Sequence, residues 1–225
     1  MYDLLLNMCY ISEVFPLIFI FRFDYYRYNE IFILMLDFIL SKFIVAVMSI
    51  ILVYLYNWDA NLSYFFQNIY TVLYFVIISR LYKTILIDIN SKLFKVGNIL
   101  FLLAFIMNGI WFDFRYESLN YATTMVNLIF TIYGFIYFSS SERSLYSERF
   151  SNYFWLNIAL LTYNMCLFPA MLFDDLIIGE SWSFTQELLW SIVLISSILL
   201  NIVLSVSFLQ VKNAQEEVAK KWTQN

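Results

Sequence analysis

The hydrophobic positions of this chain fall into seven long runs, separated by short polar segments. A helix that crosses a membrane needs about 20 mostly apolar residues. The runs cover residues 4–21, 31–55, 63–82, 93–112, 118–138, 150–173 and 184–211. The pattern therefore predicts an all-α, polytopic transmembrane bundle of about seven helices. We expect one transmembrane domain over residues 1–211 and a short cytoplasmic helical tail over residues 212–225.

Composition supports lipid as the solvent of these helices. Of the 225 residues, 62% are hydrophobic and 13% are charged, whereas a soluble domain carries about 25% charged residues. So much apolar surface, spread over the whole length, would not fit into the core of a soluble protein of this size. The lipid bilayer is therefore the first expected partner of the chain.

Lysine and arginine are distributed unevenly between alternate connections. The segments after the first, third, fifth and seventh runs contain eleven of these residues, and the opposite side contains only Arg115. Because cytoplasmic segments of membrane proteins are enriched in lysine and arginine, we expect the N-terminus outside and the C-terminus in the cytoplasm. The expected location is a bacterial inner (plasma) membrane, with a multi-pass topology.

Two charged residues lie near the middle of predicted spans. Counting 1.5 Å per residue puts Glu13 about 14 Å deep and Lys42 close to the same depth. A single charge there costs about 2.5–3.5 kcal/mol on insertion scales, and two opposite charges at one depth on consecutive helices indicate a pair. Asp37 lies about 9 Å from the cytoplasmic end and about 140° around the helix from Lys42. Glu13 is therefore the better partner for Lys42.

This buried charge pair has a functional and a structural interpretation. As a functional element, it would be a switch or part of an ion or proton path. As a structural element, it would clamp two helices together. In a further alternative, Lys42 would extend its ammonium group toward the interface, and Glu13 would be protonated.

Uncharged polar residues also recur inside the predicted spans. The last span carries a stripe with helical spacing, formed by Glu187, Ser191, Ser197, Asn201 and Ser205. Asn127 lies in the fifth span and Asn164 in the sixth. Such residues usually form hydrogen bonds between helices. The alternative is a polar cavity that Asn127, Asn164 and Asn201 line together, and that holds a small ligand or water.

The chain lacks the residue types that most catalytic and metal sites need. It has no histidine, which is the commonest general base and metal ligand. It also contains no phosphate loop, nucleotide motif or pair of metal ligands at helix spacing, so we predict neither an enzyme nor a cofactor.

The sequence contains no cluster of basic residues that could follow a nucleic acid backbone. Cys9 and Cys166 are expected as small buried side chains, the alternative being one disulfide.

The C-terminal tail, QVKNAQEEVAKKWTQN, has the pattern of a helix that continues the last span. Glu216 and Glu217 each precede a lysine by four residues, which is the favourable order for ion pairs on a helix. Its apolar stripe consists of Val211, Ala214, Val218 and Trp222. The tail is either a solvated helix end or a docking helix for a cytoplasmic signalling protein.

Three stretches resemble elements of a group of seven-span membrane proteins from Bacteroidota. The run SEVFPLIFIF is similar to the Glu–x–x–Pro element of the first span in that group. The runs FFQNIYTVLYFVIIS and FWLNIALLTYN are similar to elements of its third and sixth spans. This chain departs from the group at Tyr74 and Lys42, where members often carry an acid. Some members look like sensor-input domains ahead of histidine kinases, and others stand alone.

These observations favour a role in signal input or regulation, in which a ligand or a membrane state shifts the bundle and the tail reports the change. The alternative is an oligomeric ion pore or membrane effector, for example in phage defence, followed by a small-solute transporter. The polar stripe of the last span distinguishes the first two. In a sensor it faces the interior of the bundle, whereas in a pore it faces the symmetry axis of a homo-oligomer.

Overall fold

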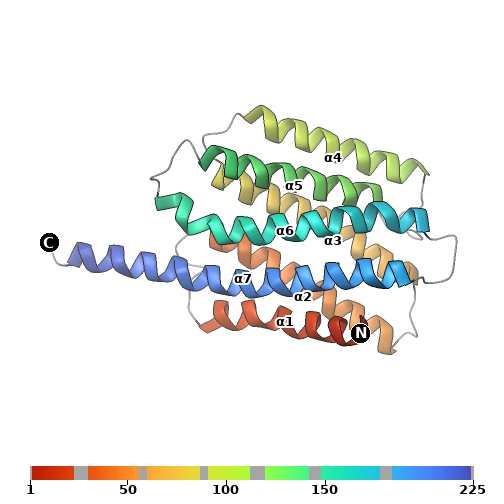
Figure 1. Ribbon diagram of the computed structural model, residues 1–225, viewed down its shortest axis with the longest axis horizontal. Helices are drawn as coiled ribbons and strands as arrows, with labels where there is room; N and C mark the ends of the chain where they lie inside the picture. Colours follow the sequence, from red (N-terminus) through yellow and green to blue (C-terminus); the bar gives the residue numbers. More distant parts are fainter. Residues whose placement is uncertain are drawn as a thin grey trace.

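The computed structural model describes residues 2–22, 30–55, 60–86, 91–111, 120–141, 148–177 and 184–223, and these residues form seven α-helices. The helices are α1 (Tyr2–Arg22), α2 (Glu30–Leu55), α3 (Ala60–Ile85), α4 (Ser91–Trp111), α5 (Asn120–Ser141), α6 (Glu148–Ile177) and α7 (Phe184–Thr223). They run along a common direction, and α1 begins at the opposite end of the bundle from the end of α7 (Figure 1). The all-α bundle predicted from the hydrophobic pattern is confirmed.

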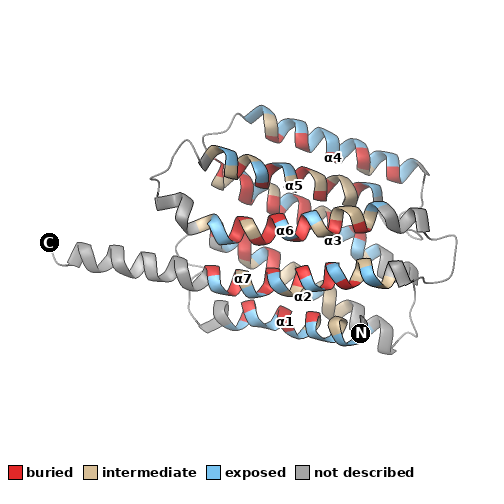
Figure 2. Ribbon diagram, viewed as in Figure 1, coloured by how far each residue is buried: buried red, intermediate tan, exposed pale blue. Residues whose placement is uncertain are grey.

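The surface of the bundle is apolar, and its interior is partly polar. Leu4, Ile11 and Ile110 are more than 60% exposed, while buried serine, threonine and asparagine side chains lie on most of the helices. Along the described helices, buried and exposed residues alternate, because one face of each helix is turned inward and the other outward (Figure 2). Such a distribution suits helices that lipid surrounds.

Several of the described helices can cross a membrane. α4, α5, α6 and α7 contain apolar segments long enough to do so, over residues 91–110, 121–140, 153–172 and 187–207, and α1 contains a shorter apolar segment, Leu4–Ile18. The chain is therefore an integral, multi-pass membrane protein. The side of the membrane that each terminus faces stays a prediction from the lysine and arginine distribution.

Six helices form a closed ring, and one lies outside it. α1 packs on α2 and α7, α3 packs on α2 and α5, and α6 lies between α5 and α7. α4 packs mainly on α5, at the edge of the bundle (Figure 1). The interior that a functional site could use is therefore enclosed by α1, α2, α3, α5, α6 and α7.

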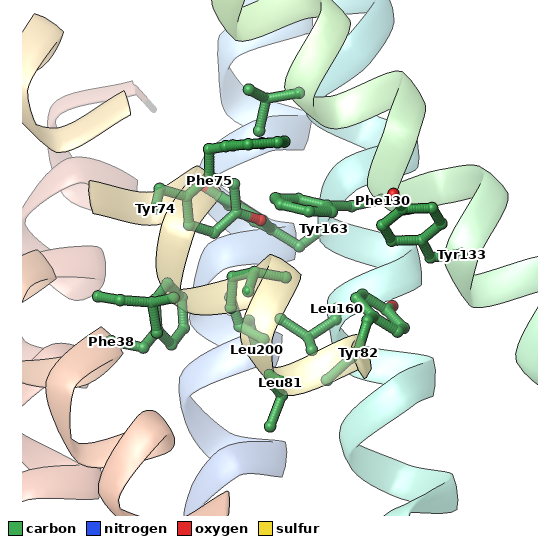
Figure 3. Close-up of a cluster of buried hydrophobic side chains, with 14 of the residues drawn as sticks. Phe38, Tyr74, Phe75, Leu81, Tyr82, Phe130, Tyr133, Leu160, Tyr163 and Leu200 are labelled. Carbon is green, nitrogen blue, oxygen red and sulfur yellow. The ribbon is translucent and has the colours of Figure 1, made fainter. Parts of the chain in front are cut away.

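Aromatic side chains fill much of this interior. The ring of Tyr74 lies 5.6 Å from Phe38, 5.4 Å from Phe130 and 6.5 Å from Tyr163, measured between ring centroids (Figure 3). The edge-to-face arrangement of Tyr74 with Phe130 and with Tyr163 is a favourable geometry for aromatic pairs. The side chains from α2, α3, α5 and α6 are thus packed against one another at the level of Tyr74.

Polar side chains form hydrogen bonds between neighbouring helices. The Tyr82 hydroxyl in α3 donates to Asn157 Oδ1 in α6 at 3.0 Å, and Asn157 Nδ2 donates to the Gly134 carbonyl in α5 at 3.3 Å. Asn108 Oδ1 in α4 accepts the backbone N–H of Ala122, in the first turn of α5, at 2.8 Å. Because the first N–H groups of a helix have no partner within it, Asn108 satisfies a group that would otherwise be costly in a membrane.

Gly97 allows the close approach of α4 to α5, and this leads to a testable prediction. A Cβ atom at Gly97 would collide with the hydroxyl oxygen of the buried Tyr133. We expect Gly97→Ala to lower the free energy of unfolding by about 1–3 kcal/mol, because the added methyl overpacks the contact. The Tyr133 hydroxyl has no hydrogen-bond partner among the described residues, so Tyr133→Phe alone should cost little.

The double variant Gly97→Ala/Tyr133→Phe separates this collision from other effects. It lacks the colliding oxygen and should recover most of the stability that Gly97→Ala loses. The measurement is thermal unfolding in detergent, and Gly109→Ala is the matched control, since Gly109 is an exposed glycine of the same helix. A double variant no more stable than Gly97→Ala would contradict this explanation of the α4–α5 contact.

Candidate functional site

Glu13 and Lys42 form an ion pair inside the bundle. Lys42 Nζ lies 3.6 Å from Glu13 Oε1, and the two side chains are 12% and 8% exposed, respectively. The structure thus brings together the two charges that helix depth predicts as partners. Since a lone charge is costly inside a membrane, each residue compensates part of the cost of burying the other.

The local sequence of α1 places a polar backbone group beside Glu13. Pro16 lies inside this helix and has no N–H to donate to the carbonyl four residues earlier, which belongs to Ser12. The Ser12 side chain is buried and donates to the Cys9 carbonyl at 2.7 Å. The segment from Ser12 to Pro16 therefore concentrates polar groups on a helix whose other face is apolar.

Lys42 also connects α2 to α7. Its Nζ atom donates to Ser197 Oγ at 2.8 Å and to Asn201 Oδ1 at 3.1 Å. Asn201 Nδ2 in turn donates to Ser12 Oγ at 2.8 Å, so the chain of contacts returns to α1. We call these five residues, Ser12, Glu13, Lys42, Ser197 and Asn201, the Lys42 network. It joins three consecutive helices of the ring, α2, α1 and α7, in the bundle interior.

Tyrosine side chains border the network on the side of α3 and α6. Lys42 Nζ lies 5.9 Å from the centroid of the Tyr163 ring, within the range of a cation–π contact. The Tyr74 hydroxyl donates to Asn164 Oδ1 at 2.9 Å, and Tyr70 stacks on Tyr74 with a centroid distance of 5.8 Å. The ammonium group thus lies between a carboxylate, two polar side chains of α7 and an aromatic face.

Two polar atoms of this region have no hydrogen-bond partner among the residues that the structure describes. They are Glu13 Oε2 and the hydroxyl of Tyr70, and both are buried. Buried polar atoms of this kind are normally satisfied, and leaving one unpaired costs about 1–3 kcal/mol. Glu13 therefore retains the capacity to accept a further hydrogen bond.

The asparagines predicted to line a shared cavity lie in different surroundings. Asn164 accepts from Tyr74, Asn201 belongs to the Lys42 network, and Asn127 is buried with neither amide atom paired among the described residues. No hydrogen bond between described residues joins the three. Asn164 and Asn201 instead fit the other interpretation, in which polar residues bond between helices.

The remaining predicted residues lie outside the network. Asp37 is exposed on α2, in agreement with its predicted angular separation from Lys42. Glu187 is half-buried in the first turn of α7, whereas the other members of the predicted stripe are buried. Cys9 and Cys166 are both free, so the alternative of a disulfide between them is wrong. The side chains of the tail stripe, from Val211 to Trp222, lie outside the described residues.

Ser12 and Tyr163 are parts of this region that the sequence reasoning missed, whereas Tyr74 entered it only as a departure from the resembled group. Ser12 adjoins Glu13 in the sequence, and this proximity is a signal that could have identified it. Tyr163 precedes Asn164, which was predicted, but a one-residue step turns about 100° around a helix. No sequence pattern indicates that the Tyr163 ring faces Lys42.

No protein-family model, curated protein or solved structure matches this chain. The resemblance to seven-span Bacteroidota proteins therefore stays a prediction.

Proposed function

We propose that this protein is a signal-input or regulatory membrane protein in which the Lys42 network couples the bundle to α7. The observation that supports this most strongly is the position of Lys42, which pairs with Glu13 of α1 and donates to two residues of α7. A change at Glu13 or Lys42 would therefore act on the contacts that hold α7 against its neighbours.

The length of α7 makes it suitable as the output element. Its 40 residues correspond to about 60 Å at 1.5 Å per residue, which is about twice the thickness of the hydrocarbon core. The helix continues without a break from the Lys42 network to Thr223. Rotation or displacement at Ser197 and Asn201 would reach the tail, where the expected partner is a cytoplasmic signalling protein.

In this proposal, the signal is a change in which acceptors the Lys42 ammonium group contacts. In one state the ammonium group contacts Glu13, Ser197 and Asn201 together. In the other, a ligand or a proton on Glu13 weakens the contact to α1, and Lys42 keeps only the two residues of α7. A ligand shifts such an equilibrium only as far as its affinities for the two states differ. The Glu13 Oε2 atom, which has no hydrogen-bond partner among the described residues, is the atom at which a ligand could bind the two states with different affinity.

The polar stripe of α7 favours this proposal over an oligomeric pore. Ser191, Ser197, Asn201 and Ser205 are buried within the bundle of a single chain. A pore on the symmetry axis of an oligomer would need such residues on the outer surface. The leucines beside the stripe are buried as well, with Leu200 and Leu204 at most 1% exposed, so apolar side chains pack against the polar ones in the same interior.

Distances between spin labels test the coupling. Cys9 and Cys166 are replaced by alanine, and labels are attached at Lys83→Cys near the end of α3 and at Gln215→Cys in the tail. We expect Lys42→Met to shift or broaden the distance distribution between the labels, because α7 loses its bonds to α2. The matched control is Asp37→Asn, which removes an exposed charge from the same helix.

The spin-label comparison tests the coupling as long as the Lys42→Met variant is folded. A Lys42→Met variant that is monodisperse, and whose distance distribution equals that of the parent, would refute the coupling of the network to the tail. A shift in Asp37→Asn of the same size would also refute it, since the effect would then be unspecific.

A further inference from the structure

The Lys42 ammonium group occupies a cation site that other residues build. Three oxygen atoms surround Nζ: Ser197 Oγ at 2.8 Å, Asn201 Oδ1 at 3.1 Å and Glu13 Oε1 at 3.6 Å. The Tyr163 ring contributes an aromatic face at 5.9 Å. Each of these four residues is less than 10% exposed, so the surroundings of the cation are largely fixed by the packed bundle.

The charge and spacing of the site fit an ammonium ion. Glu13 supplies one negative charge, and the other two oxygens are neutral, so the site balances one positive charge. Among the described residues, no group of three acidic, histidine or cysteine side chains could hold a metal ion, and calcium binds several oxygens at about 2.3–2.6 Å. The two shorter distances are instead those of N–H···O hydrogen bonds, and aromatic faces favour ammonium groups.

Glu13 has an acceptor atom that no described residue uses. Its Oε2 atom is buried and has no partner among the described residues, and a carboxylate can accept about four hydrogen bonds through its two oxygens. A free ammonium ion could therefore bind Glu13 through Oε2 and compete with Lys42 for the carboxylate.

We propose that Glu13, Ser197, Asn201 and Tyr163 form a binding site for a small primary ammonium ion, which Lys42 fills with its own side chain, and that primary amines are the ligand class that the site recognises. This rests on the proposed function, since it names the ligand of the same site. An amine that takes the place of the Lys42 ammonium group breaks the contact between Lys42 and Glu13, so α1 loses its ion pair with α2.

Chemical rescue of Lys42→Ala tests the site directly. Alanine retains Cβ, so propylammonium replaces the three missing carbons and the ammonium group. Loss of a buried partner costs about 3–5 kcal/mol, which corresponds to a fall in Tm of about 6–20 °C for a chain of this size. We expect propylammonium chloride to restore at least half of that fall in detergent-solubilised protein, whereas sodium chloride and n-propanol at equal concentration should not.

Two variants serve as controls. Lys83→Ala removes an exposed lysine and should show neither the fall nor the rescue. Glu13→Gln/Lys42→Ala lacks the carboxylate, so propylammonium should stabilise it no more than sodium does. Equal effects of propylammonium and sodium on Lys42→Ala, equal effects of propylammonium and propanol, or a full rescue of the double variant would each overturn the proposal.

The test also holds if Lys42→Ala does not survive purification alone. The comparison is then the recovery of monodisperse Lys42→Ala after extraction in propylammonium chloride or in sodium chloride, and equal recovery overturns the proposal.

A failure of the amine site can be distinguished from a failure of the signalling proposal. Rescue without a shift between the spin labels would leave an amine site that does not signal, whereas a shift without rescue would leave a switch with another ligand.

Discussion

Neither Glu13→Lys nor Lys42→Glu is expected to accumulate as folded protein, whereas the double variant with the two charges exchanged is expected to do so. Each single reversal places two like charges where the structure has opposite charges 3.6 Å apart. Breaking a buried pair costs about 3–5 kcal/mol, and repulsion adds to that cost. The sum is comparable with the whole stability of many proteins, which is about 5–15 kcal/mol.

The exchange restores opposite charges, and the neighbours of the pair can adapt to it. The Ser197 hydroxyl can donate as well as accept, and the Asn201 amide offers both kinds of atom. The readout is the yield of monodisperse protein from membranes, with Asp37→Lys as the control, since this change reverses an exposed charge of α2. A charge-exchanged variant that accumulates no better than the poorer single reversal would refute the pair.

Asn201→Ala is expected to lower the free energy of unfolding by about 1–3 kcal/mol. Asn201 accepts from Lys42 and donates to Ser12, and an interhelical hydrogen bond in a membrane contributes about 0.6 kcal/mol on average and up to about 1.7 kcal/mol. The substitution removes two such bonds at once. It also leaves Ser12 without its donor from α7.

Ser205→Ala is the matched control for Asn201→Ala. Ser205 is a buried residue of the same helix, one turn farther along, and its hydroxyl donates to the Asn201 carbonyl within α7. It should cost less than Asn201→Ala, because the bond it loses joins no two helices. Denaturant-induced unfolding in mixed micelles measures both. Equal losses would mean that Asn201 does not connect α7 to its neighbours.

The helices and the charge pair could be predicted from the sequence because lipid imposes simple rules. Every backbone polar group in the hydrocarbon must be satisfied within a helix or a barrel, so an apolar run of sufficient length indicates a helix. Depth follows from the rise per residue, and this alone placed Glu13 and Lys42 at one level. The angular separation of Asp37 from Lys42 excluded the competing acid by the same geometry.

The surroundings of the pair could not be predicted, because depth gives neither the order of helices around the bundle nor the rotation of each. That α7 packs against α1 is what brings Asn201 to Ser12 and Lys42. α4 lies outside the ring and contacts it through side chains such as Phe101, whose ring centroid is 4.0 Å from that of Phe75. The same lack of rotational information made Asn127 an apparent partner of Asn164 and Asn201.

A double-mutant cycle with Glu13→Gln and Lys42→Met tests the central claim most directly, because both changes remove a charge without introducing one. The free energy of unfolding is measured for the parent, the two single variants and the double variant. The structure predicts a coupling free energy of about 1–3 kcal/mol, with the double variant more stable than the sum of the single losses implies. Losses that add to within about 0.5 kcal/mol would contradict it, since the two residues would then act independently.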